Sequence, residues 1–326
     1  MAETIALAVR EKHLPKSDLA RVTVDTTVQE KNITYPVDSK LLYKAIVKLG
    51  DAAKSHGIPL RQSYVRVGKR AAVMASRYAH AKQFKRMHRR LRKLRTYVGR
   101  LIRDIGRKAT DPDEALVTLL DRADRIRCQK PKDKNKLYSL HEPDVRCISK
   151  GKAHKRYEFG QKISVATTNR SNWFVASALM EGNPYDGHTL KETLTTVERV
   201  TGVAVADAYV DKGYRGHGYT GGAEVHIAGQ RKKNTTRTER KRRRRRSAIE
   251  PKIGHLKSDH RMGRCFLAKL CGDAINAVLA AAGSNLRKLL GLLRRGSGRF
   301  VLALIRCYRN LIAALPDRRS LHLAAV

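Results

Sequence analysis

One strand-like segment lies far from all the others. Residues 21–33, RVTVDTTVQEKNI, alternate valines with polar residues, and this period of two is typical of a strand with one buried face. The next strand-like segments, 157–168 and 173–183, begin only after more than a hundred further residues. We therefore predict an α/β domain in which a large insertion follows the first strand and the rest of a mixed sheet with flanking helices comes after it.

The remaining patterns complete this order. A helix over 187–202 ends at Gly202, two strand-like segments follow at 203–216 and 223–230, and a helix covers 246–257. We divide the chain into an N-terminal helix with the first strand (1–37), a basic helical insertion (38–150), the remainder of the α/β domain (151–295) and a C-terminal helical tail (296–326).

The predicted insertion is strongly basic. No Asp or Glu occurs between Ala52 and Arg103, while apolar residues spaced three and four apart from Phe84 to Ile105 predict a long helix with one buried seam. A further helix is expected over 111–128, with Asp111 as its N-cap. An ordinary packed helix explains the seam but not the long stretch without an acid, so we predict a basic binding surface.

The net charge of the chain, +40, predicts a polyanionic partner. Nucleic acid is the first candidate and an acidic membrane surface the second. The late apolar stretch, 300–315, is broken by Arg306, Arg309 and Asn310, which argues against a membrane span. The five scattered cysteines fit reduced thiols in a cytoplasm better than a disulfide framework.

Three acids have the placement that a phosphodiester-cleaving metal site needs. Asp25 lies on the first strand, on the face opposite the valines, and Asp211 ends a later strand just before Gly213. Glu250 lies on the 246–257 helix, on the same face as Arg246 and Lys257. Hard oxygen ligands on rigid elements suit divalent cations, which can clamp the attacking and leaving oxygens of a phosphodiester.

Each of these residues also has an ordinary interpretation. Asp25 could be a solvent-facing strand residue, and Asp211 could simply open a turn. Asp207 is a rival for the second acid because it shares strand parity with Asp211. Asp186 and His188 are explained by turn formation and N-capping, so we assign them no catalytic role. On charge alone, the basic run 240–246 would be a solvated tail.

Several motifs resemble those of the DDE transposases of the insertion-sequence-five group, which have a ribonuclease H-like catalytic domain. The resemblance runs from about Val22 to Arg287 and rests on VTVDTTVQEKNITYPVDSKLL, QSYVRVGKR, YSLHEPDVRCISKGKAHKRYEFGQKISVATT, GNPYDGHTL, AYVDKGYRGH and RRRSAIEPKIGHLKSDHRMGR. It implies that Asp25, Asp211 and Glu250 are the catalytic residues and the ligands of Mg²⁺, with Mn²⁺ as an alternative.

The signature around the family's Glu is Tyr, two residues, Arg, three residues, Glu, six residues, Lys. Arg246, Glu250 and Lys257 match it, whereas Arg243 stands at the Tyr position. Relatives carry a long helical region before the first Asp, where this chain has 24 residues, so we expect a copy that lacks that region.

The resemblance implies metal-dependent cleavage at the ends of an insertion element and strand transfer into target DNA. The expected partners are double-stranded DNA, as terminal inverted repeats and as target, and further copies of the chain, with no membrane, in the bacterial cytoplasm on the nucleoid. The residues expected to contact DNA are Lys69, Arg70, Arg89, Arg90, Arg243, Arg244, Arg245, Arg246 and Lys257. Two rivals stay open: a truncated transposase that only binds DNA, and a metal-dependent nuclease that cuts without strand transfer.

Overall fold

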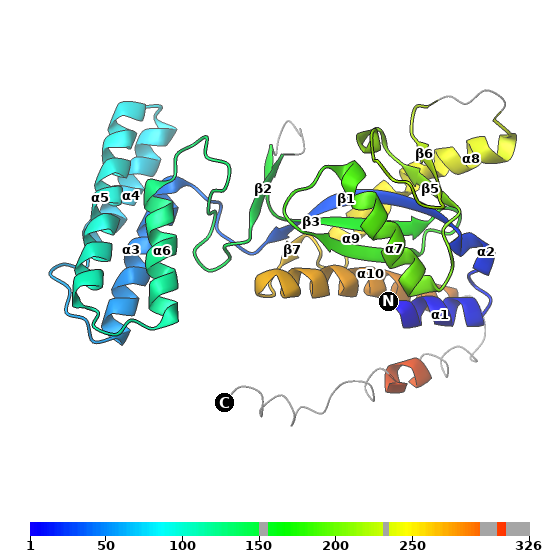
Figure 1. Cartoon of the computed structure of the whole chain (residues 1–326), viewed down its shortest axis with the longest axis horizontal. Helices are drawn as coiled ribbons and strands as arrows, with labels where there is room; N and C mark the ends of the chain where they lie inside the picture. Colours follow the sequence, from blue (N-terminus) through cyan, green and yellow to red (C-terminus); the bar gives the residue numbers. More distant parts are fainter. Residues whose placement is uncertain (150–155, 231–234, 294–304, 311–326) are drawn as a thin grey trace. The chain divides into compact units, whose positions relative to one another are not determined.

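The computed structural model describes residues 1–149, 156–230, 235–293 and 305–310 (Figure 1). The chain divides into two compact units. The first contains Met1–Lys31 and the chain from Gly160 onwards, and the second is Asn32–Phe159.

The first unit is built on a mixed sheet. Its strands are β1 (Arg21–Lys31), β3 (Tyr157–Thr168), β4 (Phe174–Met180), β5 (Asp207–Val210), β6 (Glu224–Ile227) and β7 (Arg264–Cys265). The strands run in the order β3-β1-β5-β6, with β4 beside β3 and β7 beside β1. Strand β1 is antiparallel to β3 and parallel to β5, so it occupies the middle of the sheet.

Helices cover both faces of this sheet (Figure 1). The helical segments of the unit are α1 (Ala2–Arg10), α2 (Lys16–Leu19), η1 (Asp186–Thr189), α7 (Leu190–Thr201), η2 (Lys212–Tyr214), α8 (Arg237–Arg245), η3 (Arg246–Ala248), α9 (Ile249–Ser258) and α10 (Lys269–Leu293). Val22 and Val24 of β1 pack with α1 and α7 on one face. Ile163 and Val165 of β3 pack with α9 and α10 on the other face.

This arrangement confirms the predicted fold class. A mixed sheet with helices on both faces is consistent with a ribonuclease H-like domain, and a block of helices follows the first strand. The alternation of 21–33 does give a strand, whose apolar and acidic residues point to opposite faces because successive side chains alternate across a sheet.

The second unit contains the basic helices. They are α3 (Asp38–Ser55), α4 (Val65–His80), α5 (Phe84–Lys108) and α6 (Glu114–Cys128), followed by β2 (Arg146–Ser149). The predicted seam of α5 is buried: Leu94, Val98 and Ile105 have no exposed surface. The unit therefore has an apolar core of its own. The predicted domain bounds, including 38–150 for the insertion, stay a prediction.

Two predicted helices differ from the observed ones. The helix expected over 111–128 begins at Glu114, because the side chain of Asp113, and not of Asp111, accepts a hydrogen bond from Leu116 N (2.7 Å) and caps it. The helix expected over 246–257 is interrupted: Arg246 lies in the 3-10 turn η3, between α8 and α9. Within the described residues, no helix is long and apolar enough to span a membrane. The predicted tail, 296–326, falls outside the described residues except for 305–310, which are helical.

Candidate functional site

Asp25 lies half-buried in the middle of the sheet. Its Cα partner on β3 is Val165, which packs with Ile249 and Leu256 of α9. Because paired residues of neighbouring strands point to the same face, the Asp25 side chain lies on the face that α9 covers. Its Oδ1 accepts a hydrogen bond from Thr26 N (2.7 Å), which fixes the carboxylate close to the backbone.

Asp211 directly follows β5, so the pairing of β5 with β1 determines which residue of β1 lies beside it. Arg21 pairs with Asp207 and Thr23 with Tyr209 in the parallel β1–β5 pair. Continuing this register by two more pairs, Val24 with Val210 and Asp25 with Asp211, brings the two acids level, on chain segments about 4.8 Å apart. Asp211 Oδ1 accepts a hydrogen bond from Gly213 N (2.8 Å), so the turn that follows the strand fixes this carboxylate.

The Tyr214 side chain is affected by the charges of both acids and of a third acid, Asp186. Tyr214 has no exposed surface, and its pKa is raised first by burial and then by the negative charges of Asp25, Asp186 and Asp211, with the Thr189 hydroxyl acting in the opposite direction. Three carboxylates therefore act on one buried phenol. Among the described residues, the Tyr214 hydroxyl has no hydrogen-bond partner.

Asp186 is the residue that sequence reasoning missed. It does not cap the 3-10 helix that begins with it, so the N-capping interpretation is wrong. Its Oδ1 instead accepts hydrogen bonds from Thr26 Oγ1 (2.9 Å) and Lys162 Nζ (3.0 Å). A Cβ atom built at Gly213 would lie 3.0 Å from Asp211 Oδ1 and 3.4 Å from Asp186 Oδ2, so both carboxylates flank this glycine. The local sequence gives no signal of these contacts, because they depend on the pairing of β1 with β3.

Glu250 lies in the first turn of α9. This helix contacts β1, and its buried Ile249 and Leu256 lie against the sheet, as the apolar stripe predicts. The Glu250 side chain is 59% exposed, and its Oε1 accepts a hydrogen bond from Arg246 Nη2 (3.0 Å). Exposed pairs of this spacing contribute only about 0.3–0.5 kcal/mol, so Glu250 can exchange Arg246 for another cation. Its role as the third acid stays a prediction.

The basic residues ahead of Glu250 differ in their surroundings. Arg243, which stands where the resemblance expects Tyr, is half-buried and bound to its own unit: it donates to Glu239 Oε1 (2.9 Å) and Gln230 O (3.0 Å). Arg244 is exposed, whereas Arg245 is half-buried. These differences make Arg244 the residue of this run that is best placed to meet a ligand from solvent.

The other predicted DNA contacts lie on two separate surfaces. Lys257 is half-buried in α9. In the second unit, Lys69, Arg70 and Arg89 are exposed and Arg90 is half-buried. Contacts of these five residues with DNA stay predictions.

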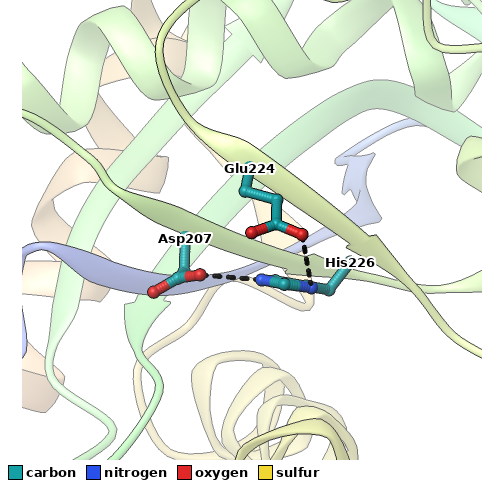
Figure 2. A group of neighbouring side chains, drawn as sticks. All are labelled: Asp207, Glu224 and His226. Atoms are coloured by element: carbon teal, nitrogen blue, oxygen red, sulfur yellow. Dashed lines mark hydrogen bonds and ion pairs between the residues drawn. The ribbon is translucent and has the colours of Figure 1, made fainter. Parts of the chain in front are cut away.

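A second group of potential metal ligands lies on β5 and β6. Asp207, Glu224 and His226 each offer a ligand atom, and these atoms lie within 4.8 Å of one another (Figure 2). His226 Nε2 is 2.7 Å from Asp207 Oδ1 and its Nδ1 is 3.9 Å from Glu224 Oε1. This group could hold a metal ion, but guanidinium groups lie on both sides of it. Arg21 Nε is 3.2 Å from Asp207 Oδ2, and Arg243 Nη2 is 3.3 Å from His226 Nδ1.

The Asp25–Asp211 edge of the sheet fits a divalent cation better. Its donor atoms are carboxylate oxygens, which hard cations prefer, and a buried phenol hydroxyl there has no hydrogen-bond partner within the part of the chain that the structure describes. Two cations near this edge form ion pairs with carboxylates: Lys162 with Asp186, and Arg246 with Glu250.

Comparison with known proteins gives a family match. A model of the transposase DDE domain matches residues 114–286, just over half of the chain. The matched range includes Asp186, Asp211 and Glu250, whereas Asp25 lies outside it. A protein of Rhizobium meliloti described as "Uncharacterized protein ORF8 in nfe locus" is 64% identical over 66 residues. These residues are 20% of this chain and 32% of the relative, so the match spans about a third of the relative's length. No solved structure matches.

Proposed function

The chain belongs to the transposase DDE domain family, and we propose on that premise that it is a DNA transposase of the insertion-sequence-five group. It would cleave DNA at the ends of an insertion element and join those ends to target DNA. One observation carries the proposal: Asp25 and Asp211 lie at the same level of neighbouring parallel strands, each held by a hydrogen bond from a backbone N–H.

We propose that Asp25, Asp211 and Glu250 together hold Mg²⁺, for which Mn²⁺ can substitute. The bound metal would supply Lewis-acid activation of the attacking oxygen and charge neutralisation at the leaving oxygen. The chain supplies the geometry: β1 and β5 fix two carboxylates in the sheet, and α9 carries the third on the same face. Glu250 would leave Arg246 when the metal binds, which frees the Arg246 guanidinium to bind a phosphate as a two-pronged donor.

DNA binding is proposed to use two basic surfaces. One is the segment from α8 to α9, with Arg244, Arg246 and Lys257. The other is formed by the acid-free stretch 52–103 of the second unit, in which Lys69, Arg70 and Arg89 are exposed. Such surfaces bind the phosphate backbone without reading sequence, so affinity would fall steeply with salt. Action on two DNA ends further requires more than one copy of the chain, and we propose a homo-oligomer on DNA in the bacterial cytoplasm.

The test is cleavage of a linear duplex that carries the ends of the chain's own element, with Mg²⁺ and the full-length protein. We expect nicked and joined products from the wild-type protein and neither product from Asp25→Asn or Glu250→Gln. Both variants should bind the same duplex with nearly unchanged affinity, because they remove no basic residue. Glu192→Gln, which changes an exposed acid of α7, is the matched control and should react like the wild type.

The rival functions predict other results. Binding without any cleavage by the wild-type protein would support a protein that only binds DNA. Nicks without joined products, in reactions that contain target DNA, would support a nuclease. Cleavage that persists in Asp25→Asn and Glu250→Gln would contradict the proposed acids.

A further inference from the structure

Asp186 is held by two donors on the same oxygen. Thr26 Oγ1 and Lys162 Nζ both donate to Oδ1, at 2.9 and 3.0 Å. Lys162 Nζ also donates to Pro184 O (2.6 Å), and its side chain is only 10% exposed, so the ammonium group has a fixed position. These contacts fix the rotation of the Asp186 carboxylate.

The second oxygen of Asp186 lies beside Gly213, as does a carboxylate oxygen of Asp211. A Cβ atom built on the backbone of Gly213 would lie 3.4 Å from Asp186 Oδ2 and 3.0 Å from Asp211 Oδ1. Among the described residues, no side chain donates a hydrogen bond to Asp186 Oδ2, so the contacts at Oδ1 leave this second oxygen able to accept from a ligand.

Tyr214 supports a ligand site between these carboxylates. Its ring is fully buried and its hydroxyl has no hydrogen-bond partner among the described residues. The neighbouring Thr189 hydroxyl donates to the Asp186 carbonyl (2.7 Å). Tyr214 thus places a buried hydroxyl where η1, which begins with Asp186, contacts η2, which follows Asp211.

We propose that Asp186 is a fourth carboxylate of the divalent-cation site, a positioning residue that presents Oδ2 to the hydration shell of a cation held by Asp25 and Asp211. The inference rests on the proposed function, because it assumes a cation at these two acids. Lys162 and Thr26 would act through Asp186 by fixing its Oδ1. Outer groups of this kind typically change metal affinity by about 10- to 100-fold when they are removed.

The experiment measures Mn²⁺ binding to the full-length protein without DNA, by the electron paramagnetic resonance signal of free Mn²⁺. Asp186→Asn keeps an acceptor oxygen for Thr26 and Lys162 but removes the charge and one acceptor. We expect it to weaken Mn²⁺ binding about tenfold while the Tm of the metal-free protein changes little. Glu192→Gln is the matched acid-to-amide control on the adjacent helix α7 and should bind Mn²⁺ like the wild type.

A second pair of variants keeps the test decisive if Asp186→Asn does not fold. Thr26→Val removes a donor to Asp186 Oδ1 and should weaken Mn²⁺ binding, whereas Thr26→Ser keeps the hydroxyl and should not. A lower Tm with unchanged Mn²⁺ affinity in Asp186→Asn and Thr26→Val would overturn the inference and leave Asp186 as a structural clamp.

Asp25→Asn and Asp211→Asn separate this inference from the proposed function. If they lose Mn²⁺ binding while Asp186→Asn binds normally, only the role of Asp186 fails. If they bind Mn²⁺ as tightly as the wild type, the proposed metal site fails, and the inference about Asp186 fails with it.

Discussion

Asp25 and Asp211 lie at the same level of two neighbouring parallel strands, although they are far apart in the sequence. Each carboxylate is held by the backbone, Asp25 by Thr26 N and Asp211 by Gly213 N. Two like charges held this close repel each other unless a cation lies between them. The sheet thus keeps in place an arrangement that a bound cation would stabilise.

This relationship predicts a repulsive coupling in the metal-free protein. Asp25→Asn and Asp211→Asn each keep the acceptor oxygen for the backbone N–H and remove one charge. In a double-mutant cycle of urea unfolding we expect an unfavourable interaction between the two carboxylates of about 0.5–1 kcal/mol. Saturating Mn²⁺ should reverse its sign. A cycle between Asp25→Asn and Glu192→Gln is the control, and a coupling as small as in that control would mean that the two carboxylates do not face each other.

Arg243 and Arg244 should behave differently on substitution, although they are adjacent. Arg243→Ala removes hydrogen bonds to the half-buried Glu239 and to Gln230, so we expect a loss of about 0.5–1.5 kcal/mol in the free energy of unfolding. Arg244→Ala should leave stability unchanged, weaken DNA binding and reduce the salt-dependence slope by about 1. Fluorescence anisotropy at several salt concentrations and urea unfolding measure both effects. Equal losses of DNA affinity in the two variants would contradict this distinction.

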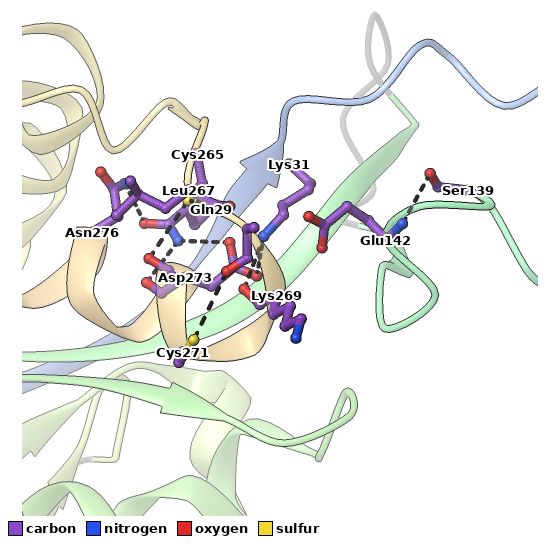
Figure 3. Close-up of polar contacts among 12 residues, drawn as sticks. Gln29, Lys31, Ser139, Glu142, Cys265, Leu267, Lys269, Cys271, Asp273 and Asn276 are labelled. Atoms are coloured by element: carbon purple, nitrogen blue, oxygen red, sulfur yellow. Dashed lines mark hydrogen bonds and ion pairs between the residues drawn. The ribbon is translucent and has the colours of Figure 1, made fainter. Parts of the chain in front are cut away.

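The buried ion pair of Lys31 and Asp273 should dominate the attachment of α10 to β1 (Figure 3). Lys31 Nζ lies 3.0 Å from Asp273 Oδ2, and both side chains are 3% exposed. Lys31→Met leaves a buried carboxylate without its cation, which we expect to cost about 3–5 kcal/mol of unfolding free energy. The double variant Lys31→Met/Asp273→Asn should recover much of this loss. Urea unfolding followed by circular dichroism measures this loss. A cost of under about 1 kcal/mol would contradict the prediction, because it would mean that the pair contributes no more than an exposed ion pair.

Stability should also depend on pH through Lys288. Burial, and then the charge of Lys252, lower the pKa of Lys288 to about 8, while its Nζ lies 4.5 Å from the Trp173 ring centroid. The unfolded chain keeps the ordinary lysine pKa of about 10.4. Above pH 8 the unfolded state therefore binds more protons than the folded state, and stability rises with pH. Buried Cys265, whose pKa is raised to about 11, has the opposite effect in this range, so the difference between two proteins isolates Lys288. We expect the unfolding free energy of the wild type, relative to that of Lys288→Met, to rise between pH 8 and 10. Parallel pH profiles of the two proteins would contradict the shift.

The features that sequence alone predicts are local ones. The alternation of 21–33 places Asp25 on a strand, and the glycines after residue 210 place Asp211 at a strand end. Both follow from the periodicity and turn chemistry of a few consecutive residues. The apolar spacing of Ile249 and Leu256 likewise predicts the buried face of α9.

The features that sequence does not predict depend on pairing between distant segments. Asp186 looks like a turn residue, and only the β1–β3 register brings Thr26 and Lys162 to its carboxylate. Asp207 and His226 meet because β5 pairs with β6 in parallel, which no local pattern specifies. The break at the start of the 246–257 helix does have a local signal, Pro251, which the helix prediction overlooked. Proline has no backbone N–H and its ring clashes with the carbonyl four residues earlier, at Ser247 in η3, so a helix is favoured only from the turn that contains Pro251.

The central claim is that one metal site is built from β1, the end of β5 and α9. Replacing Mg²⁺ with Fe²⁺ in the presence of ascorbate and peroxide generates radicals that cut the backbone next to the bound metal, and mass spectrometry locates the cuts. We predict cuts beside Asp25, Asp211 and Glu250 that disappear in Asp25→Asn. Cuts gathered instead beside Asp207, Glu224 and His226, and unchanged in Asp25→Asn, would contradict the claim.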